Sequence, residues 1–170
     1  SEDGNIWCTV RNRGICRISP SGKWKLYPHA KDFLTLDVTT DGTIWATTGE
    51  GQLLSFASTD PSVYTDYTLK AGLNGDMVDH VKVDRFNHLW IMTPQSIREF
   101  NPKNGAVRVY STGDNDIVQH RFLPRAVFRD PQSGEMYFGG IPGMFSFKTS
   151  QRLESIPQDV HTRITDVKVM

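Results

Sequence analysis

The stretch that decides the fold is Asp41-Gly42-Thr43-Ile44-Trp45-Ala46-Thr47-Thr48-Gly49-Glu50-Gly51, because versions of it recur along the chain. An earlier copy covers residues 3–10, a later copy covers 84–93, and a looser copy covers 130–140. The aromatic anchors of the copies are Trp7, Trp45, Trp90 and Tyr137. Successive anchors lie 38 (7 to 45), 45 (45 to 90) and 47 (90 to 137) residues apart.

A repeat of this period, with several short strands in each unit, is typical of β-propeller blades. We expect an all-β fold of about four four-stranded antiparallel units, with borders near 1–32, 33–76, 77–123 and 124–157. The first unit lacks a counterpart of the innermost strand, so we expect it to be truncated on its N-terminal side. Proline and glycine separate the expected strands, and no helical periodicity of useful length competes.

The composition of the phrase has a physical explanation. An Asp-Gly pair such as Asp41-Gly42 suits a tight turn, because glycine adopts a positive φ easily and aspartate can bond the backbone of the turn. The following Ile44 and Trp45 are neighbours on a strand and therefore face opposite sides. Both faces of the sheet are then apolar, as a sheet packed between two other sheets requires.

The last segment, 158–170, differs from the repeats. Residues 157–159 break the pattern, and 162–169 alternate like one further strand. This strand either closes the last blade or opens a following domain. The chain also begins inside a repeat, as an excised piece of a longer protein would.

Composition excludes few classes of function. The chain has 170 residues with 19 basic and 19 acidic side chains, so no excess charge favours nucleic acid or an anionic membrane. No apolar run approaches the ~20 residues of a membrane span. We expect no contact of this segment with nucleic acid or membrane.

The two cysteines flank the turn 11–14. A hairpin centred near Asn12 places Cys8 and Cys16 roughly opposite each other, where a disulfide is geometrically conceivable. The alternative is a pair of free thiols packed as small apolar side chains.

Side chains that suit catalysis are scarce. The five histidines have no metal-binding spacing, and no nucleophile or phosphate-binding motif occurs, so we expect no catalytic residue, metal or cofactor. The candidate ligand site is His120, Arg121 and Arg125 near Phe122, because cations beside an aromatic ring can hold a sugar by charged bonds and stacking. An ordinary solvated loop around a buried Phe122 is the alternative reading.

The units resemble the two-component-regulator propeller repeats in the periplasmic sensor region of hybrid two-component histidine kinases. The resemblance rests on the pattern Asp-x-x-Gly-x-aliphatic-Trp-x-x-Thr-x-x-Gly, on Tyr67 or Tyr110 later in the unit, and on the segment 72–78. The phrase 136–147 is similar to the final blade of such sensors. In the third unit Asn87-His88 stands where the pattern has glycine, which puts the tight turn of that unit in question.

The resemblance implies several further properties. The chain would hold the C-terminal blades of a seven-bladed propeller, and 164–169 would lead into an immunoglobulin-like domain. The full-length parent would be a histidine kinase of the inner membrane, and this segment would be periplasmic and non-catalytic. It would take part in recognising glycan-derived oligosaccharides and in signalling to transcription of polysaccharide-utilisation genes.

Two alternatives stay open. Streptogramin-lyase-like propellers repeat a phrase similar to residues 3–7, so a propeller enzyme is one alternative. A pure protein-interaction scaffold is the other. In either case a partial propeller exposes flat apolar blade faces, and we expect self-association through them.

Overall fold

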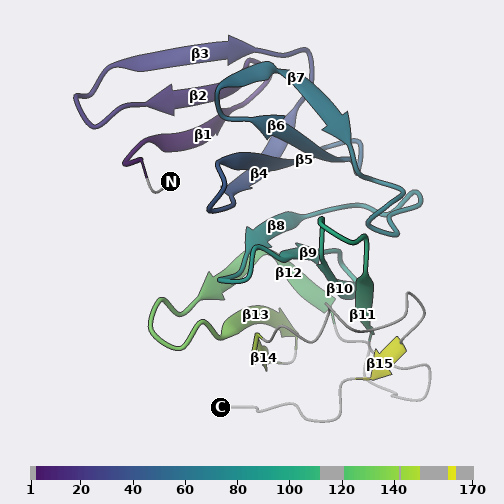
Figure 1. Cartoon of the computed structure of the whole chain (residues 1–170). Coiled ribbons are helices and arrows are strands. Elements are labelled where there is room, and N and C mark those ends of the chain that lie inside the picture. The colour runs from purple at the N-terminus through teal and green to yellow at the C-terminus, as the bar shows by residue number, and fades with distance from the viewer. Residues whose placement is uncertain (1–2, 112–120, 142, 150–160, 164–170) are drawn as a thin grey trace. The chain divides into compact units, whose positions relative to one another are not determined.

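The computed structural model describes residues 3–111, 121–141, 143–149 and 161–163, and every helix or strand element in these ranges is a β-strand. The chain divides into two compact parts, Ser1–Val81 and Lys82–Met170. The strands form four sheets, built almost entirely from strands that follow one another in the sequence (Figure 1). The predicted all-β fold of successive antiparallel blades is therefore confirmed.

The first part holds two antiparallel sheets. One contains β1 (Ile6–Val10), β2 (Gly14–Ile18) and β3 (Trp24–Pro28) in that order. The other contains β4 (Phe33–Val38), β5 (Thr43–Thr48), β6 (Leu53–Ala57) and β7 (Asp60–Asp66). A buried cluster joins the two sheets: Trp7, Ile15, Tyr27, Phe33, Ile44, Ala46, Leu54 and Phe56.

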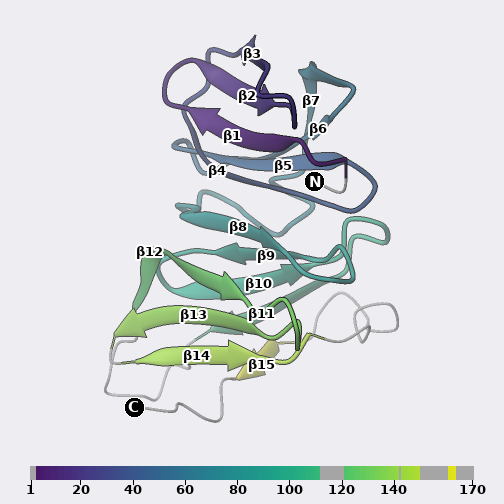
Figure 2. The same cartoon turned by 90° about the vertical axis from the view of Figure 1, so that its left-hand side faces the viewer.

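The second part also holds two sheets, which lie as neighbouring layers in Figure 2. One contains β8 (His80–Val83), whose first two residues precede the border, and β9 (Leu89–Met92), β10 (Ser96–Phe100) and β11 (Val107–Ser111). The other contains β12 (Arg121–Arg129), β13 (Met136–Ile141) and β14 (Met144–Phe147). Their shared core is Trp90, Met92, Ile97, Tyr110, Phe122, Met136, Phe138 and Phe145. Residues 150–157, where the fourth strand of the expected unit 124–157 would fall, lie outside the described residues.

The last described segment pairs in a way that the sequence did not indicate. β15 (His161–Arg163) runs parallel to β11, with the register Val109↔His161. It thus extends the third sheet to five strands and does not join β12–β14. The expected strand 162–169 lies largely outside the described residues, so its role in closing the last blade or opening a following domain stays a prediction.

The repeat anchors occupy similar but unequal positions. Trp45 and Trp90 are buried together with the preceding Ile44 and Leu89, so both faces of these strands are covered. In the first sheet Trp7 is buried while Ile6 is 63% exposed, so one face is open. In the fourth sheet Tyr137 is half-buried, between the fully buried Met136 and Phe138.

The turn before the anchor is the same in the second and third sheets, although their residues differ. Gly42 N donates to Thr39 O, and Thr39 N donates to Thr43 O. In the third sheet Asn87 N donates to Asp84 O, and Asp84 N donates to His88 O. Asn87 has a φ of 63°, close to the 82° of Gly42. Asparagine tolerates this left-handed conformation better than most residues, so the turn survives the loss of glycine.

Candidate functional site

The three predicted ligand-binding residues are only partly described. His120 lies outside the described residues. Arg121 opens β12 and is exposed, and Arg125 is exposed four positions later with an unusual φ of 64°. Phe122 between them is fully buried and packs edge-on against Phe145, with 5.0 Å between ring centroids. The burial of Phe122 fits the solvated-loop reading as well as the ligand reading.

A bulge in β12 presents Arg125 to solvent. Phe122 pairs with Gly140 and Val127 with Phe138, so residues 123–126 of β12 face the single residue 139 of β13. Bulges bend a strand and re-aim its side chains, and they are frequent beside functional sites. A non-glycine residue with positive φ is uncommon enough to mark such a place.

Two glycines of β13 allow the bulge to lie close to it. A Cβ atom on Gly139 would lie 2.8 Å from Cβ of Ala126. A Cβ atom on Gly140 would lie 3.0 Å from the carbonyl oxygen of Arg121. The Gly139-Gly140 pair of the repeat phrase therefore has a packing role beneath the exposed arginines.

A second group of titratable side chains is buried in the third sheet. Glu99 on β10 pairs in register with Trp90 on β9 and with Arg108 on β11, so the three side chains form one row across the sheet. His88 lies just before β9, and Asp84 begins the turn that leads to it. Asp84, His88 and Glu99 are each at most 3% exposed.

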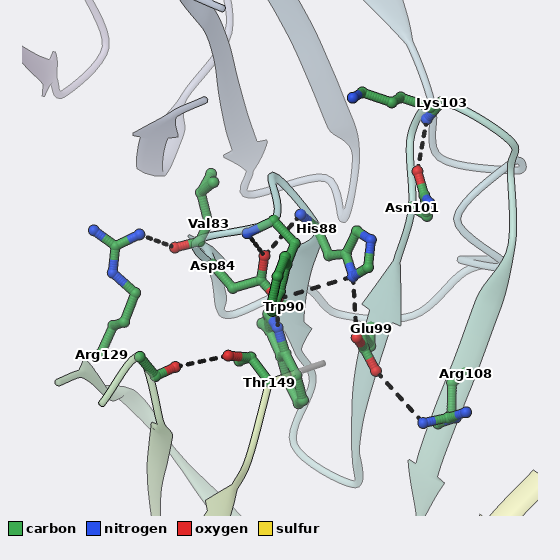
Figure 3. Close-up of polar contacts among 12 residues, drawn as sticks. Val83, Asp84, His88, Trp90, Glu99, Asn101, Lys103, Arg108, Arg129 and Thr149 are labelled. Atoms are coloured by element: carbon green, nitrogen blue, oxygen red, sulfur yellow. Dashed lines mark hydrogen bonds and ion pairs between the residues drawn. The ribbon is translucent and has the colours of Figure 1, made fainter. Parts of the chain in front are cut away.

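Asp84, His88, Trp90 and Glu99 are connected by short polar contacts (Figure 3). Asp84 Oδ1 accepts the backbone N–H groups of Phe86 at 2.8 Å and His88 at 2.9 Å. Asp84 Oδ2 accepts the indole N–H of Trp90 at 3.0 Å. His88 Nδ1 lies 3.2 Å from Glu99 Oε1 and 3.9 Å from Asp84 Oδ2. His88 thus bridges the two buried carboxylates.

The other oxygen of Glu99 faces β11. Glu99 Oε2 accepts the phenol of Tyr110 at 3.0 Å and lies 3.9 Å from Arg108 Nη1. Burial, and next the charge of Glu99, raises the pKa of Tyr110 well above its ordinary value of 10.0. The phenol therefore stays a donor across the physiological pH range.

Asp84, His88 and Glu99 form the one group in the described ranges with donor atoms close enough to hold a cation, within 4.8 Å of one another. Yet Asp84 Oδ2 and Glu99 Oε2 already accept Trp90 and Tyr110. The three side chains are at most 3% exposed, so the group lies in the core and not in an open site. The arrangement acts as a hydrogen-bond network that ties β9, β10, β11 and the turn at Asp84 together.

Sequence reasoning missed this network because Asp84 and His88 fall in a turn, where such residues are usually solvated. The signal that was available is Glu99. It lies two positions after Ile97 in the short strand 96–100 and therefore on the same face as that apolar side chain, where a buried acid requires a partner.

An open cleft of about 410 Å³ lies at one end of the first sheet. Its lining residues are Asn12, Arg13, Leu26, Pro28, His29 and Ala30. Nε2 of His29 lies 2.7 Å from the carbonyl oxygen of Pro61, to which it can donate a hydrogen bond. Arg13 is the exposed cation in the lining of the cleft. Sequence reasoning did not single out this cleft, since its residues come from the turn between β1 and β2 and from the end of β3 with the residues after it.

The described part of the chain contains no helix with the length and hydropathy of a membrane span. No family model and no curated protein sequence matches the chain.

Among solved structures, the chain is similar to the extracellular domains of two proteins of B. thetaiotaomicron. BT3049, described as a hybrid two-component system, matches with a TM-score of 0.60 and 15% identity, over 85% of this chain and 19% of its own. BT4673, described as a one-component system, matches with a TM-score of 0.62 and 12% identity, over 89% of this chain and 23% of its own. A second structure describes BT4673 as a hybrid two-component system and matches with 20% identity and a TM-score of 0.56.

The chain is also similar to virginiamycin B lyase from Staphylococcus aureus, solved as a catalytically inactive variant with quinupristin. Here the TM-score is 0.62 and the identity 18%, over 93% of this chain and 55% of the lyase. The chain thus spans about a fifth of the two extracellular domains and about half of the lyase. At these identities the likeness shows the fold, which is that of β-propeller blades.

Proposed function

We propose that this chain is a non-catalytic part of the extracytoplasmic sensor region of a hybrid two-component system. The observation that carries the proposal is the match of 85% of the chain to the extracellular domain of BT3049, together with the recurring repeat phrase. The segment would lie in the periplasm of a longer inner-membrane parent. That parent would respond to glycan-derived oligosaccharides and signal to transcription of the genes that degrade them.

The candidate contacts for an oligosaccharide are the exposed guanidinium groups of Arg121 and Arg125, together with His120, which precedes Arg121 in the sequence. Both arginines are exposed on β12, and the buried Phe122 of the same strand holds it against the core. Guanidinium groups bind carboxylates by paired hydrogen bonds, so this surface favours acidic sugars such as uronates.

The test is calorimetric titration of the chain with a panel of acidic and neutral oligosaccharides. We expect an acidic member to bind, and Arg125→Ala to weaken that binding roughly tenfold, as the loss of a charged hydrogen bond does. Lys103→Ala is the matched control, because it removes an exposed cation from the loop after β10. Equal loss in both variants, or no binding across the panel, would contradict the ligand assignment.

A propeller lyase is the second candidate, and the match over 93% of this chain favours it. A lyase needs a base that its substrate can reach. His88 lies 3.2 Å from a carboxylate oxygen of Glu99, as a base in such a site could, but it is 2% exposed. Incubation with quinupristin followed by mass spectrometry separates the two candidates: we expect the unchanged compound, and a ring-opened product would establish the enzyme.

A further inference from the structure

Cys8 and Cys16 are direct partners in the antiparallel ladder of β1 and β2. Their pair is the central one of five, between Ile6↔Ile18 on one side and Val10↔Gly14 on the other. Side chains that are opposite each other in such a ladder lie on the same face of the sheet. Both thiols are therefore held side by side by paired backbone on either side of them.

The spacing of such a pair suits a disulfide. Opposite residues of an antiparallel ladder have Cα atoms about 4.5 or 5.5 Å apart, depending on whether the pair exchanges hydrogen bonds. Disulfides span Cα distances of about 4.4–6.8 Å, and both spacings fall within that range. The sulfur of Cys8 already lies 3.8 Å from the carbonyl oxygen of Cys16.

The two thiols differ in access. Cys16 is 8% exposed, whereas Cys8 is half-buried. Burial, and then the nearby Cys16, raises the pKa of Cys8 above its ordinary value of 9.0. That influence of Cys16 agrees with the adjacency that the register gives.

We propose that Cys8 and Cys16 form an intramolecular cross-strand disulfide when the chain meets a disulfide oxidant, either a small molecule or a protein. The Cys8 thiolate attacks one sulfur of the oxidant, which forms a mixed disulfide and releases one thiolate. The Cys16 thiolate then attacks the Cys8 sulfur and releases the second thiolate. The two protons lost by the cysteines pass to the two released thiolates, so two protein thiols are oxidised and one oxidant disulfide is reduced.

The bond would fasten an edge of the sheet. β1 is a terminal strand in the order β1-β2-β3, so it is paired on one side only within that sheet. A covalent link at the centre of the ladder prevents β1 from separating from β2. The inference does not depend on the sensor proposal, although an extracytoplasmic location would supply an oxidising environment.

The test equilibrates the full chain in mixtures of reduced and oxidised glutathione, quenches with acid, alkylates the free thiols and counts them by mass spectrometry. We expect a monomer that lacks two hydrogens and takes up no alkylating agent. In strong denaturant at the same redox ratio we expect at least about tenfold less of this species, because a flexible segment gives only a millimolar effective concentration. Equal yields in the native and denatured chains, or two alkylated thiols in the native chain, would overturn the proposal.

A matched variant keeps both thiols but breaks the geometry. Cys8→Ser combined with Thr9→Cys moves one thiol a single position along β1, onto the opposite face of the sheet. We expect this chain to give glutathione mixed disulfides and no internal bond. Circular dichroism confirms that it folds, and Cys16→Ser alone provides a second variant that must also lose the internal species. Closure in the shifted variant would show that register does not control the reaction.

Discussion

The indole nitrogen of Trp90 donates a hydrogen bond of 3.0 Å to Oδ2 of Asp84, whereas the indole nitrogen of Trp45 has no hydrogen-bond partner in the structure. The two tryptophans follow turns with the same backbone hydrogen bonds, and the position of Asp84 is taken by Thr39 in the second sheet. The hydroxyl of Thr39 is directed to Asp41 and to the backbone of Thr43. The residue that begins the turn, Asp84 or Thr39, therefore determines whether the buried indole N–H has an acceptor.

Removing Asp84 should destabilise the chain far more than removing Asp41. Asp84→Ala deletes three hydrogen bonds and leaves the indole N–H of Trp90 and the backbone N–H groups of Phe86 and His88 without their acceptor, which should cost about 3–5 kcal/mol. Asp41→Ala removes an exposed turn acid that accepts from Thr43 N, at a cost of about 1 kcal/mol. Urea unfolding measures both. Equal losses would mean that the network adds nothing to the turn.

Tyr110 should make the fold sensitive to alkaline pH. Its pKa is raised in the folded chain, so its contribution is complete below the unfolded value of about 10 and is lost as pH rises above it. Tyr110→Phe should flatten the decline of stability above about pH 10, while costing about 1–3 kcal/mol at neutral pH because Glu99 loses a donor. Thermal unfolding from neutral to alkaline pH provides the measurement. Tyr64→Phe is the control, because Tyr64 lies on β7 and is 42% exposed.

Gly139→Ala should disturb the bulge of β12. The new methyl group would lie 2.8 Å from Cβ of Ala126, a contact that neither side chain can relieve by rotation. We expect a loss of about 1–3 kcal/mol, as overpacking usually causes. The double variant with Ala126→Gly should recover most of it, whereas Ala126→Gly alone should cost about 1 kcal/mol or less. Additive losses in this cycle would show that the contact is absent.

The turn at Asn87 should accept glycine and reject β-branched residues. Asn87 holds a φ of 63°, which costs an ordinary L-residue roughly 1–2 kcal/mol. Asn87→Gly should change the free energy of unfolding by less than about 0.5 kcal/mol, and Asn87→Val should lower it by at least about 1 kcal/mol. Denaturant titration of the pair separates backbone conformation from loss of the amide group. A glycine variant as unstable as the valine variant would assign the role to the amide.

The open face of the first sheet should promote self-association, which we propose as the property of this segment that is most directly observable. The pairs Ile6↔Ile18 and Ile18↔Trp24 place three apolar side chains in one row, with Ile6 63% and Trp24 72% exposed. Sedimentation across a concentration series to tens of micromolar should show dimers or larger species. Trp24→Lys should weaken the association, and Val63→Lys on β7 should not. A concentration-independent monomer would contradict this proposal.

Local sequence predicted the parts of the fold that local chemistry controls. The phrase around Trp45 predicted a turn followed by a strand with two apolar faces. The turn at Gly42 and the strand β5, with Ile44 and Trp45 both buried, confirm this prediction. The prediction that Cys8 and Cys16 lie opposite each other is also confirmed, because a short hairpin leaves the register of its two strands little freedom.

Other features depend on contacts between distant segments and leave no local pattern. The parallel pairing of β15 with β11 involves three residues, too few for a periodic signal. The bulge of β12 follows from how β13 pairs on either side of it. The network around Glu99 needs β9, β10 and β11 in register before its members meet.

The tryptophans also give the chain a natural set of fluorescent reporters. Trp7 and Trp45 are buried and Trp24 is exposed in the first compact part, while Trp90 is the single tryptophan of the second. Its indole lies parallel to the ring of Tyr110, 5.7 Å away, and bonds a carboxylate. A chain with phenylalanine at positions 7, 24 and 45 would therefore emit from the buried network alone. Its spectrum would follow the unfolding of the second part separately from the first, without any attached dye.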